Sequence, residues 1–106
     1  RLDVQLLYEA LDDFNRAEGL SGGKEKFVPF YRGKIHFQVE NFERAKQDFQ
    51  KCIDLDSTFA EAYHSLALSR IVTEGKTPAS ETCALLRKSV ELGFTKAQEL
   101  VEAYCK

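Results

Sequence analysis

Residues 19–25, with the sequence GLSGGKE, contain the residue types of a phosphate-binding loop. Such a loop needs four residues between its glycine positions, a Ser or Thr after its lysine and a strand before it. Here three residues separate Gly19 from Gly23, Glu25 follows Lys24, and no strand pattern precedes the segment. We therefore expect a flexible connection between two helices at this point.

The histidines and cysteines are spaced wrongly for a metal site. His36 and His64 lie 28 residues apart, and the chain has no Cys-x-x-Cys pair. We expect no metal ion and no other cofactor. A Cys–His nucleophilic pair would also need an orienting third group and an oxyanion loop, and nothing in the sequence marks either one. No catalytic residue is predicted, and a small hydrolase is kept only as the third functional alternative.

The composition of the 106-residue chain, with 43% hydrophobic and 30% charged residues, is typical of a soluble globular domain. Seventeen acidic residues against fifteen Lys and Arg give a formal charge of −2 without a basic tract, which disfavours nucleic acids and anionic membranes as partners. No apolar stretch approaches the roughly 18 residues of a membrane span. No signal peptide is recognised. Because the chain begins at Arg1 and contains no Met, we expect a processed or excised piece of a longer protein.

An internal repeat is visible at a shift of 35 residues. Residues 10–17 align with residues 45–52 through matching Ala, Asp, Phe and small residues. Residues 82–89 repeat the spacing more weakly at a shift of 37. The spacing i, i+4, i+7 places a small, a large and a small side chain on one helical stripe, which lets two helices approach closely. Repeats of this length indicate stacked supersecondary units.

The pattern predicts an all-α chain, because glycine, asparagine and proline separate the apolar stripes and no segment alternates like a strand. Six helices are expected, over residues 2–18, 25–39, 42–55, 59–74, 79–92 and 96–105.

The segment 26–59 resembles the 34-residue helix–turn–helix unit of the tetratricopeptide repeat family. The resemblance rests on small, aromatic and closing residues at the family's positions: Arg32, Gly33, Phe37, Ala45, Phe49, Cys52, Ile53, Leu55 and Asp56. A second unit opens at Ala60 and carries an insertion around residues 75–78. The final segment ends in Tyr104-Cys105 and resembles the close of tetratricopeptide arrays in bacteria of the Bacteroidetes type.

The resemblance implies a single tetratricopeptide-like domain over residues 1–106, stacked as a short right-handed α-solenoid. Residues 1–23 would form an N-terminal half repeat and loop, 26–59 the first repeat, 60–92 the second repeat with its insertion, and 94–106 a C-terminal capping helix. About three such units are needed to bury a continuous core.

The resemblance also assigns faces to these helices. Its groove-facing positions make a set of candidate partner-binding residues: Phe27, Phe30, Lys34, Phe37, Gln38, His64, Leu68 and Ile71. Its packing positions make a repeat core: Gly33, Ala45, Phe49, Cys52, Ile53, Tyr63 and Ala67. An exposed apolar groove would bind a peptide. The alternative is that the aromatic stripe is itself core.

Counting along the last two helices brings two cysteines level. Cys83 lies ten residues before Gly93 and Cys105 twelve after it, so the two thiols can meet at the open end of a helical hairpin. A Cys83–Cys105 disulfide would imply a periplasmic or secreted protein. The alternative is three reduced cysteines and a cytoplasmic protein. Cys52 is expected to be a buried free thiol in either case.

The sequence therefore predicts a non-enzymatic interaction module that binds a protein or peptide partner, with self-association left open. A structural or oligomerisation segment of a longer repeat protein is the second alternative.

Overall fold

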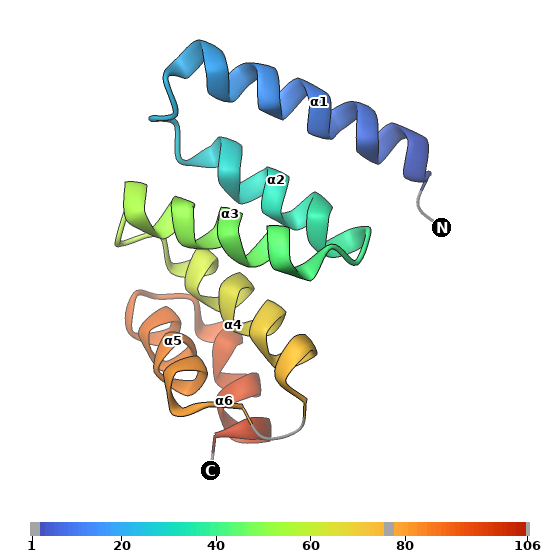
Figure 1. Cartoon of the computed structure of the whole chain (residues 1–106). Coiled ribbons are helices and arrows are strands. Elements are labelled where there is room, and N and C mark those ends of the chain that lie inside the picture. Colours follow the sequence, from blue (N-terminus) through green and yellow to red (C-terminus); the bar gives the residue numbers. More distant parts are fainter. Residues whose placement is uncertain (1–2, 76–77, 106) are drawn as a thin grey trace.

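Six α-helices and one 3-10 turn form all the regular structure in residues 3–75 and 78–105, the part of the chain described by the computed structural model (Figure 1). The elements in chain order are α1 (Val4–Ser21), α2 (Phe27–Gln38), α3 (Phe42–Leu55), α4 (Ala60–Glu74), α5 (Ser80–Glu91), η1 (Thr95–Ala97) and α6 (Gln98–Tyr104). The expected all-α class is confirmed. Residues 76 and 77 of the expected insertion lie outside the described residues.

The first helix ends three residues later than the sequence predicted. Asp3 begins it by accepting a hydrogen bond from the Gln5 amide at 3.0 Å. Gly22 ends it in the left-handed conformation, with φ of 70°, and its amide bonds back to the last turn of the helix. The prediction was wrong because it took Gly19 as the stop, whereas Gly19 adopts ordinary helical geometry.

Each helix packs mainly on its neighbours in the chain, so the helices follow one another across the molecule from α1 to α6 (Figure 1). The closest approach is between α2 and α3. A Cβ atom placed on Gly33 would lie 2.8 Å from Cε1 of Phe49, so only glycine leaves room for that buried ring. The close packing of α2 on α3 therefore depends on the absence of a side chain at Gly33.

Two hydrophobic clusters meet at α4. The first joins α2, α3 and the N-terminal half of α4, and the second joins the rest of α4 to α5 and η1. All seven residues of the expected repeat core are buried: Gly33, Ala45, Phe49, Cys52, Ile53, Tyr63 and Ala67. Because α4 contributes to both clusters, it joins the two halves of the chain.

A buried arginine ties α1 to the α2–α3 pair. Arg32 Nε and Nη2 donate to Asp48, and its Nη1 and Nη2 donate to Glu18. Nη1 also donates to Asn15 at 3.0 Å. These five hydrogen bonds use all five N–H donors of the guanidinium. The cost of burying this charge is offset because every donor has a partner.

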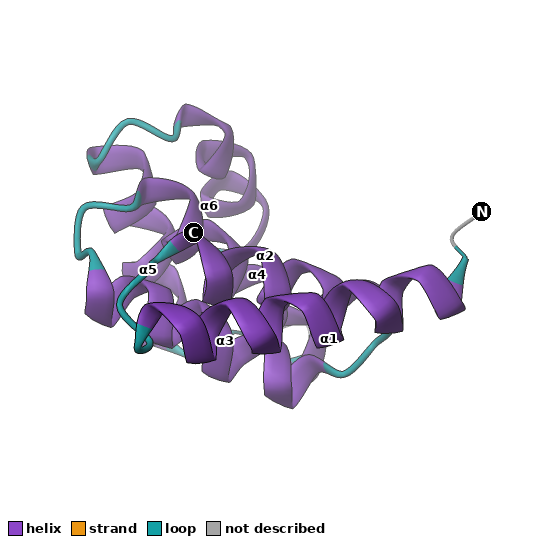
Figure 2. Cartoon of the chain, turned by 90° about the horizontal axis from the view of Figure 1, so that it is seen from above, coloured by secondary structure: helices purple, strands orange, loops and turns teal. Residues whose placement is uncertain are grey.

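Two further contacts hold the same part of α1: Lys51 of α3 pairs with Glu18, and Phe14 stacks on Tyr31 with ring centres 6.3 Å apart. Leu11 is the one buried residue of the helix. The N-terminal half of α1 extends past the neighbouring helices (Figure 2).

The Gly33 contact predicts opposite effects for two glycine-to-alanine substitutions. Gly33→Ala should lower the free energy of unfolding by about 1–3 kcal/mol, because the new methyl group overpacks against Phe49. Gly19→Ala meets no atom within 4 Å and should stabilise the helix by up to about 1 kcal/mol. Urea denaturation of both variants measures the difference. Equal stability of the two variants would contradict the packing described here.

The ion pair between Arg32 and Glu18 predicts that the stability of the fold falls at acid pH. Hydrogen bonding to Arg32 lowers the pKa of Glu18 from 4.5 to about 2, against an opposing effect of burial. The unfolded chain therefore binds more protons between these pH values, and the stabilisation is lost as the pH falls from about 4.5 to 2. Glu18→Gln should lower stability by on the order of 2 kcal/mol at pH 7 and flatten the acid limb of the stability–pH curve.

The matched control is Asp13→Asn, which removes a carboxylate that is about three-quarters exposed, as is its partner Arg16. This variant should keep the wild-type acid limb. An unchanged acid limb in Glu18→Gln would show that Glu18 does not hold α1 in place.

Candidate functional site

A cleft of about 260 Å³ opens between α2, α4 and the turn that follows α5. Its apolar part is formed by aromatic and aliphatic side chains, and its rim by charged and amide side chains. The lining residues are Lys34, Phe37, Gln38, Phe49, Glu61, His64, Ser65, Leu68, Phe94 and Lys96. We refer to it as the α2–α4 cleft. Its volume is below the roughly 300–1,000 Å³ of small-molecule pockets, so it fits a few side chains.

Two neighbours, Glu61 and Phe30, hold the ammonium group of Lys34 in position. Its Nζ lies 3.5 Å from Oε2 of Glu61, on the facing helix α4. The same Nζ lies 5.2 Å from the centre of the Phe30 ring, close enough for a cation–π contact. Both carboxylate and ammonium remain about half exposed, so the pair is weak and an incoming charged group can compete for either member.

His64 of α4 lines the cleft. Its ring centre is 5.0 Å from that of Phe94, which belongs to the turn after α5. Burial lowers the pKa of His64 below its usual 6.5, and the nearby carboxylate of Glu61 opposes this effect. The imidazole is therefore neutral at pH 7, with one nitrogen that donates and one that accepts a hydrogen bond.

The structure divides the eight predicted partner-binding residues into three groups. Five of them line the α2–α4 cleft: Lys34, Phe37, Gln38, His64 and Leu68. Phe30 and Ile71 are 3% and 7% exposed and belong to the interior. Phe27 is 47% exposed but packs beside Phe59 and Tyr31, outside the cleft.

The assignment of Phe30 to the groove is therefore corrected. Its ring is covered by Phe59 at 4.7 Å and by Phe49 at 6.1 Å between ring centres. Phe59 precedes α4 and lies outside the helix positions from which the groove was inferred. Ile71 is covered because α4 supplies it to the second cluster, with Leu86.

Four cleft residues were not in the predicted sets: Glu61 and Ser65 of α4, and Phe94 and Lys96 after α5. Phe94 lies in the turn after α5 and Lys96 in the 3-10 segment η1. Both follow the weak third repeat copy, which covers residues 82–89. Gly93 adopts a φ of 109° there, which turns the chain back over α4. The available sequence signal for this part of the cleft was Phe94, an aromatic residue directly after Gly93.

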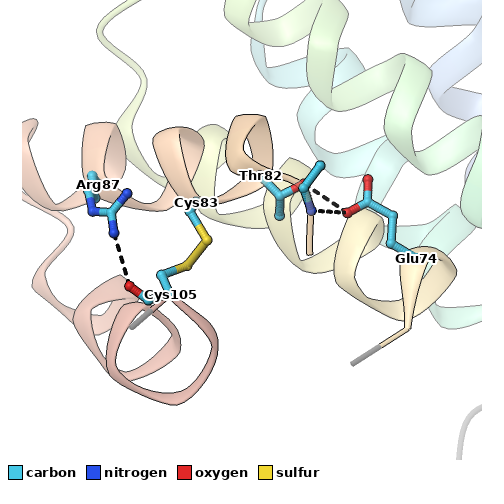
Figure 3. The surroundings of a disulfide bond; sticks show 6 residues. Glu74, Thr82, Cys83, Arg87 and Cys105 are labelled. Atoms are coloured by element: carbon cyan, nitrogen blue, oxygen red, sulfur yellow. Dashed lines mark hydrogen bonds between the residues drawn. A yellow bond between two sulfur atoms is a disulfide. The ribbon is translucent and has the colours of Figure 1, made fainter. Parts of the chain in front are cut away.

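A disulfide holds this side of the cleft in place. Cys83 of α5 and Cys105 at the end of α6 are bonded, with their Cα atoms 5.7 Å apart (Figure 3). Arg87 Nη2 adds a hydrogen bond of 3.0 Å to the Cys105 carbonyl oxygen. The bond fixes α6 on α5, and α6 in turn continues directly from η1, which carries Lys96.

Cys52 is the buried free thiol that the sequence analysis expected. Burial raises the pKa of Cys52 to about 11, so this thiol is protonated and unreactive at neutral pH.

A second cleft, of about 540 Å³, lies between α1, α2 and α3 and is lined mainly by polar groups. Its central charges, on Arg32, Glu18 and Asp48, are already paired with one another. His36 also lines it, and burial lowers the pKa of this histidine. Because the charges of Arg32, Glu18 and Asp48 are paired with one another, this cleft is a weaker candidate than the α2–α4 cleft.

Within residues 3–75 and 78–105, no three His, Cys, Asp or Glu side chains come together as metal ligands could. None of the described helices is long and apolar enough to span a bilayer.

The disulfide predicts a redox-dependent stability. A closed loop of this length contributes about 3 kcal/mol in the chain-entropy model, so the double variant Cys83→Ser/Cys105→Ser should lose about that much stability. Dithiothreitol should destabilise the wild type by a similar amount and leave the double variant unchanged, as followed by thermal unfolding. A wild type that melts identically with and without the reductant would contradict a stabilising bond.

No protein-family model matches the chain, and a search of curated proteins finds no match.

Proposed function

We propose that this chain is a non-enzymatic interaction module that binds a segment of a protein partner in the α2–α4 cleft. The main support for this proposal is the cleft itself. Side chains from α2, α4 and the turn after α5 form its apolar interior and its charged rim. Mostly apolar concave sites with a few placed polar groups are the usual form of binding sites.

The chemistry of the cleft supports a particular kind of peptide. Phe37, Leu68 and Phe94 offer an apolar surface for one bulky side chain. Lys34 shares its charge with Glu61, whereas Lys96 makes no ion pair within the described part of the chain. A suitable peptide would bury an aromatic or aliphatic anchor in the apolar interior of the cleft. A neighbouring carboxylate of the peptide would pair with Lys96. The neutral His64 would add a hydrogen bond to the peptide backbone.

A tetratricopeptide-like arrangement is part of this proposal. It is supported by the order of the helices, by the buried small residues Ala45 and Cys52 and by the close contact of Gly33 with Phe49. In that arrangement α2 and α4 are the groove-facing helices of two successive units. The Cys83–Cys105 disulfide further supports an oxidising location, periplasmic or secreted, because such bonds persist there.

The proposal predicts a charge-specific loss of binding. Peptides selected from a random phage-displayed library on the wild-type protein should carry the apolar–acidic pattern. Lys96→Glu should weaken the best selected peptide at least about tenfold, a loss near 1.4 kcal/mol, in isothermal titration calorimetry.

The matched control is Lys24→Glu, which makes the same charge change in the loop after α1, outside the cleft. It should change the affinity by less than about twofold, because a distant surface charge is screened by salt. Leu68→Ser should abolish binding without unfolding the half-buried site. Selected peptides that bind all of these variants equally would refute the cleft as the binding site.

A further inference from the structure

One face of α1 is left open by the described part of the chain. Five residues spaced by three or four positions share this side of the helix: Leu6, Ala10, Asp13, Ala17 and Leu20. Leu6 is 61% and Leu20 is 85% exposed, and the side chain of Asp13 is 77% exposed. The helix packs on α2 through a different side, on which Phe14 stacks against Tyr31. We refer to the five residues as the open face of α1.

The internal repeat shows how a face of this kind is used. At the shift of 35 residues, Ala10, Asp13, Phe14 and Ala17 of α1 correspond to Ala45, Asp48, Phe49 and Cys52 of α3. The four residues of α3 are all buried, where α3 packs on α2. The same pattern is thus covered by a neighbouring helix in α3 and open in α1. The helix α2 is therefore a template for a helix that the open face would bind.

The polar contact between α2 and α3 shows which side chain the open face requires. Asp48, whose side chain is 9% exposed, accepts hydrogen bonds from Nε and Nη2 of Arg32. Its counterpart Asp13 makes only one ion pair within residues 3–75 and 78–105, with Arg16 at 3.8 Å, and both side chains are about three-quarters exposed. The Asp13 carboxylate can therefore accept from an incoming arginine the paired hydrogen bonds that Asp48 accepts from Arg32.

The charge of α1 favours a basic partner over a second copy of this helix. Residues 3–21 contain five acidic residues and one basic residue, Arg16. Asp13 lies at the middle of the open face, seven residues from both Leu6 and Leu20. Two copies packed through this face would bring their Asp13 carboxylates together, whereas a basic helix would neutralise the charge.

The same template specifies the residue that follows the arginine. Gly33 directly follows Arg32, and the absence of a side chain at Gly33 leaves room for the Phe49 ring. Phe14 is the counterpart of Phe49 and lies half-buried at the border of the open face. A helix that packs on α1 as α2 packs on α3 therefore needs a glycine after its arginine.

We propose that the open face of α1 binds an amphipathic helix of a partner protein that carries an arginine followed by a glycine. The arginine pairs with Asp13, the glycine leaves room for Phe14, and apolar side chains of the helix cover Leu6 and Leu20. This surface is separate from the α2–α4 cleft, so the proposal does not depend on binding there.

A titration of the ¹⁵N-labelled whole chain with a synthetic peptide of residues 26–39 tests the proposal. This peptide has the sequence of α2 and stands for the partner helix, because it contains Arg32 and Gly33. The shifted amides should cluster at residues 6–20. Binding should be weak, in the micromolar to submillimolar range, because a helix of this length is only marginally formed when isolated in water.

Charge exchange shows whether the arginine pairs with Asp13. Asp13→Arg in the protein should lower the affinity at least about tenfold, and Arg32→Asp in the peptide should do the same. The two changes together should restore the affinity to within about threefold of the wild-type pair. The matched control is Asp12→Arg, at the next residue but outside the open face, which should lower the affinity less than about threefold.

A substitution in the peptide tests the glycine. Gly33→Leu in the peptide favours the helix but adds a side chain against Phe14, so it should weaken binding. Asp12 and Asp13 are both exposed, so unchanged far-UV circular dichroism shows that the protein variants are folded.

Four results would overturn the proposal. The first is equal loss of affinity in Asp12→Arg and Asp13→Arg, or no recovery in the charge exchange, which would reduce the effect to general attraction between an acidic helix and a basic peptide. The second is shifts confined to α3, where the peptide would replace α2. The third is tighter binding of the Gly33→Leu peptide. The fourth is a chain that dimerises without peptide in sedimentation velocity and becomes monomeric in Leu20→Asp, which would assign the open face to a second copy.

Discussion

The close approach of α2 and α3 at Gly33 is the constraint on which the rest of the molecule depends. With no side chain on Gly33, the Phe49 ring packs directly on the backbone of α2. That contact fixes the distance between the two helices, and α4 then packs on the same cluster through Tyr63 and Leu66. The position of α2 relative to α4, and so the width of the cleft, follows from it.

Two further restraints act at the ends of the molecule. Arg32 holds the C-terminal half of α1 through Glu18, and its five satisfied donors make this a specific contact rather than a general attraction. At the other end the Cys83–Cys105 bond holds α6. The cleft therefore lies on the packed central helices, whereas the N-terminal half of α1 is exposed (Figure 2).

The sequence predicted the interior better than the surface. The small–large–small stripe identified Ala45, Phe49 and Cys52, because helical spacing alone decides which side chains share a face. The groove positions implied by the resemblance misplaced Phe30, because the residue that covers this ring, Phe59, lies at the N-cap of α4, outside those positions. Lys96 was missed for a related reason: a turn set by one glycine brings it to the cleft, and periodicity carries no information about turns.

We propose that a partner segment binds between α2, α4 and the turn after α5. The most direct measurement is a titration of the ¹⁵N-labelled protein with a library-selected peptide, followed by amide chemical shifts. Binding in the cleft should shift amides that cluster at residues 34–38, 61–68 and 94–96. Shifts confined to α1 and α3, around the polar cleft between them, would contradict it.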